Sequence, residues 1–339
     1  MKIVNISFIV ISIFLLCILT FSIRQLKQTI EQGQQNILSH QKEVQKKIYN
    51  NGQTVLMNSL LSRLKEEMEE YSTLKNESIR SIAALSHSFQ EYHYEIAGQQ
   101  KEYSPERGQL LLRLALMKID SATFINIKKS TSFAKADLSG LNLSQLDLSG
   151  INLRDAQLRE ADLEGTNLKY ATLKDADLWA AQLKNAKLQH SNFFEAKVQW
   201  ADLTKANLAK AEIRGADFSN AKFRNAQLIA TDMQWGIFHN ASFHHATMDS
   251  VNLYGADLKQ ANLIKVNLSN AFIKSANLSA VNMNNANLSD ANLIYAGVEA
   301  DWLDRLKEWQ VLGADSILAK YEIAPFEYKK YNYRLMPKQ

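Results

Sequence analysis

The chain has 339 residues, 46% of them hydrophobic, which is enough for one or two domains with a buried core. Its 12 glycines and 3 prolines exclude a collagen-like or largely disordered chain, and are fewer than a mixed α/β enzyme of this size usually carries. The formal net charge of +4 is too small to indicate nucleic-acid binding by itself. The one cysteine, Cys17, excludes an intrachain disulfide and any site built from several cysteines.

Residues 1–23 predict a membrane anchor. From Ile3 to Ile23, 21 consecutive residues carry no charge and most are large and apolar, so a helix here would cross a hydrocarbon core of about 30 Å. A cleaved signal peptide is the alternative, but the stretch is too long and has no small-x-small cleavage site. Charges at the two ends nearly cancel under the positive-inside rule. We expect a single-pass cell-membrane protein with the bulk of its chain outside the cytoplasm.

Residues 24–103 predict a helical, coiled-coil-like stalk, because they lack proline and are rich in Gln, Glu, Lys and Leu. Steps of three and four from Leu61 to Ile96 meet an apolar or aromatic residue at nine of eleven positions. Such a seam would fit two helices folded on each other, or a stalk that forms a homo-oligomer through residues 61–96. It would equally fit helices packed on the chain's own domain. The proposed self-association would use Leu61, Leu64, Met68, Tyr71, Ile82, Leu85 and Phe89.

Residues 104–130 predict an N-terminal cap. Ser104, Pro105 and Glu106 form a typical helix start, with an N-cap, a first-turn proline and an acid. The leucine-rich stretch from Leu110 to Met117 is apolar nearly all round. We expect this helix to be buried against the segment that follows it.

A five-residue repeat occupies residues 131–300. Every fifth residue from Phe133 to Leu293 is Leu, Phe, Ile, Val or Met, which makes 33 positions in one register. Two residues before each of them, 22 of the 33 are Ala, and the residue between is most often Asp or Asn. Examples are AKADLSG and KQANLIKVNLSNAF.

A helix cannot use this period, because five steps of 100° rotate each Leu by about 140° from the last and no apolar face forms. Strand alternation points the apolar residue and the small residue two before it inward. Since five is odd, a straight strand would turn the next Leu outward. A bend every five residues resolves this. The repeat therefore predicts a coil of short sides stacked at strand spacing, with Leu on the axis.

These residues resemble the pentapeptide-repeat family, whose motif is A-[D/N]-L-x-x. The resemblance implies a mainly β fold, a right-handed quadrilateral β-helix with four repeats per turn, in addition to the predicted anchor, stalk and caps. It gives about eight coils, or roughly 40 Å at about 4.8 Å per layer. Residues 301–339 predict a C-terminal helical cap and a tail that straps the surface, because apolar residues from Trp302 to Leu318 suggest two short helices.

No catalytic motif is present: the sequence has no P-loop, dinucleotide fingerprint, HExxH or nucleophile elbow. We expect no enzyme activity, no cofactor and no metal. Six aspartates look like a carboxylate array but occupy the Asp/Asn position of the repeat: Asp137, Asp162, Asp177, Asp202, Asp217 and Asp257. His239, His244, His245 and Asp249 are the one metal-like cluster, and we interpret them as solvated surface residues.

Three functions remain to be compared: a membrane-anchored scaffold or protein-interaction module, a regulator of DNA gyrase, and an enzyme. No feature of the sequence supports the enzyme. The resemblance suggests the second, because some pentapeptide-repeat proteins mimic DNA with an acidic rod. Residues 131–300 carry 16 basic and 17 acidic residues, a net charge of −1, which disfavours DNA mimicry and leads us to expect no nucleic-acid partner. The expected partners are another protein and, through residues 3–23, the lipid bilayer.

Stacking every twentieth residue places most outward aromatic residues on two adjacent sides, and large exposed aromatics are typical of interface cores. Tyr170 is the one outward aromatic on the other two sides. The candidate partner-binding face consists of Phe194, Trp235, Tyr254, Phe272 and Tyr295 on one side and Trp179 and Trp200 on the next.

Overall fold

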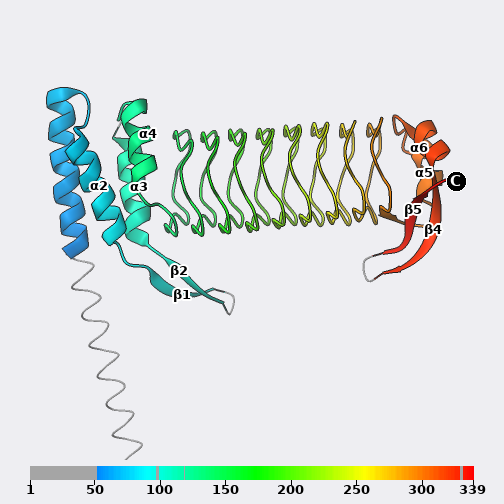
Figure 1. Cartoon of the computed structure of the whole chain (residues 1–339), viewed down its shortest axis with the longest axis horizontal. Helices are drawn as coiled ribbons and strands as arrows, with labels where there is room; N and C mark the ends of the chain where they lie inside the picture. The colour runs from blue at the N-terminus through cyan, green and yellow to red at the C-terminus, as the bar shows by residue number, and fades with distance from the viewer. Residues whose placement is uncertain (1–51, 97–98, 118, 329–330) are drawn as a thin grey trace, which may run out of the picture. The chain divides into compact units, whose positions relative to one another are not determined.

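The computed structural model describes residues 52–96, 99–117, 119–328 and 331–339 (Figure 1). Contacts divide the chain into two compact units, Met1–Ser59 and Leu60–Gln339, and the described part of the first unit is helical. The predicted anchor over residues 3–23 lies outside the described residues. Within the described ranges, no helix combines the length and apolar character needed to cross a bilayer.

The second unit begins with helices and a hairpin rather than with one long stalk. Its first helix ends at residue 71, where Ser72 has a φ of 60°, and α2 (Asn76–Ser88) follows. Strands β1 (Tyr92–Ile96) and β2 (Gln99–Tyr103) then pair as an antiparallel hairpin. The predicted helical stalk is therefore wrong over residues 92–96 and 99–103. Tyr92 and Tyr103 pair directly and are buried, and such cross-strand aromatic packing favours strands over helix.

The predicted apolar seam is used within the chain's own helical bundle. Leu64 and Ile82 have no exposed surface, and Leu61 and Phe89 are buried. Helix α2 packs against α4 (Ser121–Ser130) and α3 (Pro105–Leu116). This is one of the arrangements that the sequence leaves open, and self-association through residues 61–96 stays a prediction.

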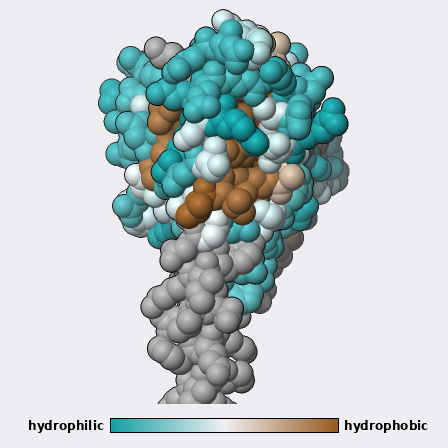
Figure 2. All heavy atoms as spheres, turned by 90° about the vertical axis from the view of Figure 1, so that its left-hand side faces the viewer, coloured by the Kyte–Doolittle hydropathy of each residue, from teal (hydrophilic) through white to brown (hydrophobic). Residues whose placement is uncertain are grey.

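Helix α3 rests on the first coil of the repeat region. Ser104 is its N-cap and accepts a hydrogen bond from the Arg107 backbone, while Leu110, Leu111 and Leu114 are fully buried. The helix is not buried all round, since Leu116 is 62% exposed. Figure 2 shows this end of the molecule, where hydrophilic residues surround one apolar area.

An ionic cluster joins the bundle to the first coil. The carboxylate of Glu91 accepts hydrogen bonds from Arg107 Nη1 at 2.8 Å and from Lys135 Nζ at 2.6 Å. Arg107, which is almost fully buried, also donates to the carbonyl oxygen of Ala134 at 3.0 Å. Gly108 of α3 passes so close to this coil that a Cβ there would lie 1.9 Å from the Asp137 carbonyl oxygen.

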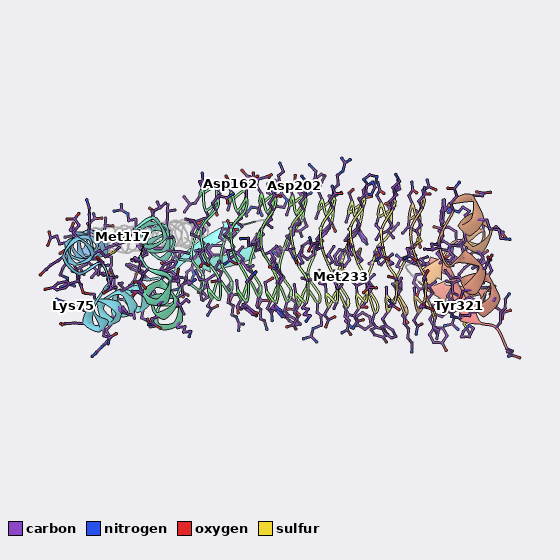
Figure 3. All side chains as sticks on the ribbon, turned by 90° about the horizontal axis from the view of Figure 1, so that it is seen from above. Lys75, Met117, Asp162, Asp202, Met233 and Tyr321 are labelled. Carbon is purple, nitrogen blue, oxygen red and sulfur yellow. The ribbon has the colours of Figure 1, made fainter. Side chains whose placement is uncertain are left out.

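The repeat region is a solenoid with four five-residue sides per coil. Parallel bridges join residues 20 apart, as in Asn142 to Asp162 and Asp162 to Gln182. The apolar residue of every repeat from Phe133 to Leu293 is at most 1% exposed. Figure 3 shows the result along the rod: Asp162 and Asp202 lie at its edge, and Met233 lies between the sides.

The bends that the odd period requires are β-turns. The backbone N–H of the residue that opens each repeat donates to the carbonyl of the apolar residue three before it, as from Ala161 to Leu158 at 3.1 Å. The third residue of the turn lies in the left-handed region at all 33 corners, and 28 of these residues are not glycine. From residue 135 to residue 275, the N–H groups of these corner residues bond to the next coil, as from Glu160 to the Trp179 carbonyl at 2.8 Å.

The last coil is covered by two helices and a β-hairpin. The helices are α5 (Trp302–Glu308) and α6 (Ala314–Lys320). In the short segment that connects them, Leu312 forms a parallel β-bridge with Asn287 of the solenoid. The predicted surface strap is instead the antiparallel pair β4 (Tyr321–Tyr328) and β5 (Tyr331–Pro337), and β5 also pairs with β3 (Gly297–Val298). The tail adopts this form because β5 satisfies backbone groups at the end of the solenoid.

Replacing Leu203 with Asp tests the solenoid core. Leu203 is fully buried, so a carboxylate there would have no partner and we expect the protein to unfold or to lose most of its thermal stability. The matched control is Thr204→Asp, one residue later on the outer surface, which should melt near the wild type. Equal melting of the two variants in circular dichroism would contradict the assigned core.

The Glu91 cluster predicts a pH dependence of the N-terminal cap. Burial raises the pKa of Glu91, but the hydrogen bonds from Lys135 and Arg107 outweigh it and hold this pKa below its usual value of 4.5. A carboxyl with a lowered pKa stabilises the folded state above the unfolded pKa, and this contribution is lost as the pH falls through the lowered value. We expect Glu91→Gln to lower the melting temperature at pH 7 and the difference from wild type to shrink by pH 3. Glu164→Gln, an exposed carboxylate of the solenoid, should show no such convergence.

Candidate functional site

The outward positions of the solenoid form columns on four flat sides. We number the sides 1 to 4 in chain order, beginning with the core residues Phe133, Leu138, Leu143 and Leu148, so each side recurs every 20 residues. Three positions of each repeat face outward: the residue directly before the core residue and the two residues directly after it.

The carboxylate array has a structural role. In 20 repeats the residue directly before the core residue is Asp or Asn, and each time its side-chain oxygen accepts a hydrogen bond from the backbone N–H two residues later. The first and last of these bonds, from Ser139 to Asp137 and from Ile294 to Asn292, are both 3.1 Å long. This bond satisfies a donor that the turn would otherwise leave to solvent. The Asp/Asn preference of the repeat therefore follows from backbone pairing.

Several of these carboxylates also bind the coil before them. A polar or basic side chain just after one core residue reaches an acid 18 residues later, on the same side of the next coil. The pairs are Arg159–Asp177 at 3.3 Å, Lys184–Asp202 at 3.6 Å, Gln199–Asp217 at 2.7 Å, Arg214–Asp232 at 3.6 Å and His239–Asp257 at 3.0 Å.

The histidine cluster does not converge. His239 lies on side 2 against Asp257, while the His244 and His245 rings of side 3 contact each other with centroids 4.3 Å apart. Asp249 accepts hydrogen bonds from Ser269, Asn270 and Ser250 instead, which lower its pKa. In the part of the chain that the structure describes, no three His, Cys, Asp or Glu residues are placed to hold a metal ion.

Three aromatic rings from three consecutive coils contact one another on side 1. The Trp235 ring meets the Tyr254 ring edge-on with centroids 5.0 Å apart, and Tyr254 stacks with Phe272 at 6.1 Å. Trp235 is 59% exposed and Phe272 is 38% exposed. Together with Tyr295 one coil further on, which is 36% exposed, they form what we call the aromatic patch: Trp235, Tyr254, Phe272 and Tyr295.

Gly255 makes room for the largest ring of the patch. A Cβ at Gly255 would lie 2.4 Å from Cζ3 of Trp235, so the indole lies directly over the glycine. At the equivalent corner two coils earlier, a Cβ on Gly215 would meet nothing closer than Glu195 Cγ at 3.4 Å. The glycine of the sequence therefore determines where the Trp235 ring lies.

The C-terminal hairpin extends the patch. The Arg334 guanidinium of β5 lies 5.2 Å from the Tyr295 ring centroid and 4.3 Å from that of Phe326. Lys274 Nζ lies 5.7 Å from the centroid of the same Tyr295 ring. Sequence reasoning did not place Arg334 or Phe326 beside side 1, because no periodicity relates the tail to the repeat.

The remaining predicted residues are separate from the patch. Phe194 is half-buried, with Lys174 Nζ 4.6 Å from its ring centroid and the Arg214 guanidinium 5.7 Å from it. Trp179, on side 2, is half-buried with the Arg159 guanidinium 4.6 Å from its ring. Trp200 is 57% exposed on side 2. Of the seven predicted residues, Trp235, Tyr254 and Phe272 therefore contact one another in series, and Tyr295 lies on the same side one coil further on.

The repeat matches a known family. The model of the family "Pentapeptide repeats" matches residues 131–169, 171–208, 201–240, 237–274 and 273–297, in eight copies. No curated protein sequence matches the chain significantly.

Solved structures of pentapeptide-repeat proteins resemble the solenoid. HetL from the cyanobacterium Nostoc sp. strain PCC 7120, described as involved in heterocyst differentiation regulation, is 30% identical over 49% of this chain and 81% of its own, with a TM-score of 0.24. A pentapeptide-repeat protein of the Arabidopsis thaliana thylakoid lumen is 25% identical over 38% of this chain and 66% of its own, with a TM-score of 0.16. QnrB1, a plasmid-mediated fluoroquinolone resistance protein, is 12% identical over 45% of this chain and 91% of its own, with a TM-score of 0.26.

The unbroken five-residue register, the 20-residue spacing of the bridges and the family match all concern the same residues. The solenoid is the right-handed quadrilateral β-helix that such repeats form. The chain belongs to the pentapeptide-repeat family.

Proposed function

We propose that this chain is a non-enzymatic protein-interaction module that docks a partner protein on the aromatic patch of side 1. The observation that carries the proposal is the contact of Trp235, Tyr254 and Phe272 across three coils, with Trp235 and Phe272 exposed to solvent and Tyr254 half-buried between them. Trp, Tyr and Arg are the residues that dominate binding energy at protein interfaces. The patch contains Trp and Tyr, and Arg334 lies at its border against the Tyr295 ring.

Rigidity supports this role. The three rings stand on backbone that is hydrogen-bonded to the coils on both sides, as from the Trp235 N–H to the Tyr254 carbonyl at 3.0 Å. A partner would therefore meet rings that are already positioned and would lose little conformational freedom in ordering them. This function consists of binding alone and involves no chemical reaction.

DNA mimicry with gyrase as the partner, the other function that the family resemblance suggests, is less well supported. A DNA mimic needs a strongly acidic surface, whereas residues 131–300 have a net charge of −1. Several solenoid carboxylates are moreover paired with side chains of the preceding coil, including Asp177 and Asp202. We therefore favour a partner held by aromatic contacts.

The test is the combined variant Trp235→Ser, Tyr254→Ser and Phe272→Ser. We expect partner recovery from detergent-solubilised membranes, measured by quantitative mass spectrometry, to fall at least about 30-fold, since a lost hot-spot residue costs about 2 kcal/mol or more. The control is Tyr170→Ser with Ile229→Ser, which removes two exposed apolar side chains from side 4 and should keep the partners. A correctly folded triple variant that retains every wild-type partner would refute the proposal.

Gly255→Ala is a gentler test of the same surface. The added Cβ displaces the Trp235 ring without removing it, so we expect several-fold weaker partner recovery. Gly215→Ala shares the left-handed backbone, with φ of 66° against 65°, but displaces no ring and should bind as the wild type. Circular dichroism checks that both variants fold.

We also propose that residues 3–23 anchor this module in a membrane, as their uncharged apolar sequence indicates. The full chain should stay in the membrane fraction after a carbonate wash, and a chain without residues 1–24 should be released. Reporter fusions at the carboxyl terminus identify the side of the membrane, which we expect to be outside the cytoplasm. Release of the full chain by carbonate would disprove the anchor.

A further inference from the structure

The basic residues of the solenoid differ sharply in whether they have a partner. On side 1, each of the five basic residues has a partner. Three form ion pairs: Lys135 with Glu91 and Glu102, Arg154 with Asp155 and Asp175, and Arg214 with Glu212 and Asp232. The other two lie against aromatic rings, Lys174 against Phe194 and Lys274 against Tyr295. Charges on that side therefore largely cancel or cover rings.

Side 3 is different beyond Asp202, which pairs with Lys184 at 3.6 Å. From that point on, this side carries Lys205, Lys222, Arg224 and Lys265, and none of these forms an ion pair with any residue that the structure describes. His244 and His245 lie between them. We call this surface the basic strip: Lys205, Lys222, Arg224, His244, His245 and Lys265.

The strip is continuous and free of acids. Its coils are hydrogen-bonded neighbours, as shown by the bonds from the Lys205 N–H to the Arg224 carbonyl at 2.9 Å and from His245 to Ile264 at 3.1 Å. It spans three coil steps, about 14 Å at about 4.8 Å per step. From residue 203 to residue 287, the outward positions of side 3 contain no Asp or Glu.

The pKa of His244 reflects the positive electrostatic potential at the strip. The pKa of His244 is lowered by burial and further by the positive charges of His245, Arg224 and Lys265. No acid of side 3 opposes this effect, and Asp249, on the neighbouring side 4, is held by Ser250, Ser269 and Asn270. The strip therefore carries uncompensated positive charge.

We infer that the basic strip binds an acidic segment of a protein partner. Four unpaired cations over about 14 Å suit an extended chain whose alternate side chains repeat about every 6.8 Å on one face. Between the cations, Thr204, Asn225 and Ser242 offer hydrogen bonds that such a segment can use. This surface is separate from the aromatic patch, so the inference does not rest on the proposed function.

Other polyanions fit this surface less well. Single-stranded nucleic acids bind through aromatic side chains on which bases stack, and side 3 has no Phe, Tyr or Trp at an outward position. The strip is also flat, without the helix or ribbon that enters a groove of duplex DNA. An anionic bilayer would favour exposed apolar side chains beside the cations, whereas Ile264, the one large hydrophobic residue at an outward position of side 3 in these coils, is half-buried.

The test measures binding of the full chain, in detergent, to a fluorescent (Glu-Gly)6 peptide at low salt. The strip variant is Lys205→Gln, Lys222→Gln, Arg224→Gln and Lys265→Gln. Its control removes the same charge from sides 2 and 4: Lys169→Gln, Lys187→Gln, Lys210→Gln and Lys259→Gln. Melting temperatures near the wild type are expected for both, because the substituted residues lie on the surface.

We expect the strip variant to bind at least about 10-fold more weakly and the control to stay within about 3-fold of wild type, as for several exposed ion pairs lost together. Added salt should weaken wild-type binding. Equal losses in the two variants, or equal binding of a (Gln-Gly)6 peptide, would overturn the inference. So would tighter, strip-dependent binding of vesicles with 30% phosphatidylglycerol or of a 20-base-pair duplex, which would assign the strip to lipid or to DNA.

Discussion

Hydrogen bonding between consecutive coils is the constraint on which the rest of this protein depends. Each five-residue side ends in a turn whose third residue has a positive φ, and at 28 corners that residue is not glycine. Such a conformation costs on the order of 1 kcal/mol for a residue with a side chain. It persists because the N–H of that residue bonds to the coil above, as from Tyr170 to the Gln189 carbonyl at 3.0 Å. A single coil could not hold these corners, so the solenoid is stable only as a stack.

The same requirement explains the composition of the repeat. Leu, Phe or Met fills the axis, Ala fits where the chain turns, and Asp or Asn satisfies the backbone N–H two residues later. Once these three positions are specified, the two remaining positions of each repeat face solvent and are free to vary. A molecule built this way presents side chains on a fixed lattice, with neighbours about 4.8 Å apart along each side.

Because the lattice is fixed, surface chemistry is sorted by side. Side 1 carries most of the outward aromatic rings, and each of its cations contacts either an acid or a ring, whereas side 3 keeps four unpaired cations in neighbouring coils. The two ends are closed by different means: the ionic cluster around Glu91 joins the helical bundle to the first coil, and the β4–β5 hairpin pairs with β3 at the last. Both devices satisfy polar groups that open ends would leave unpaired.

The sequence by itself determined the solenoid, its register and which residues point outward, because one period recurs 33 times and an odd period admits only a bent strand. With the four repeats per turn that the family resemblance implies, stacking every 20 residues also placed Trp235, Tyr254, Phe272 and Tyr295 on one side. Non-repeating segments were harder. Strand β1 shares Tyr92 and Ile96 with an apolar helical spacing, and its antiparallel pairing with β2 is what distinguishes the strand from a helix.

Only the tertiary structure decided which of the outward aromatic residues are exposed to solvent. Arg159 covers Trp179 and Lys174 covers Phe194, while Gly255 leaves Trp235 room to lie exposed. These contacts join residues about 20 apart on one side, and in the case of Tyr295 they join the solenoid to Arg334 of the tail. No local pattern encodes them, because they depend on how long side chains settle across neighbouring coils.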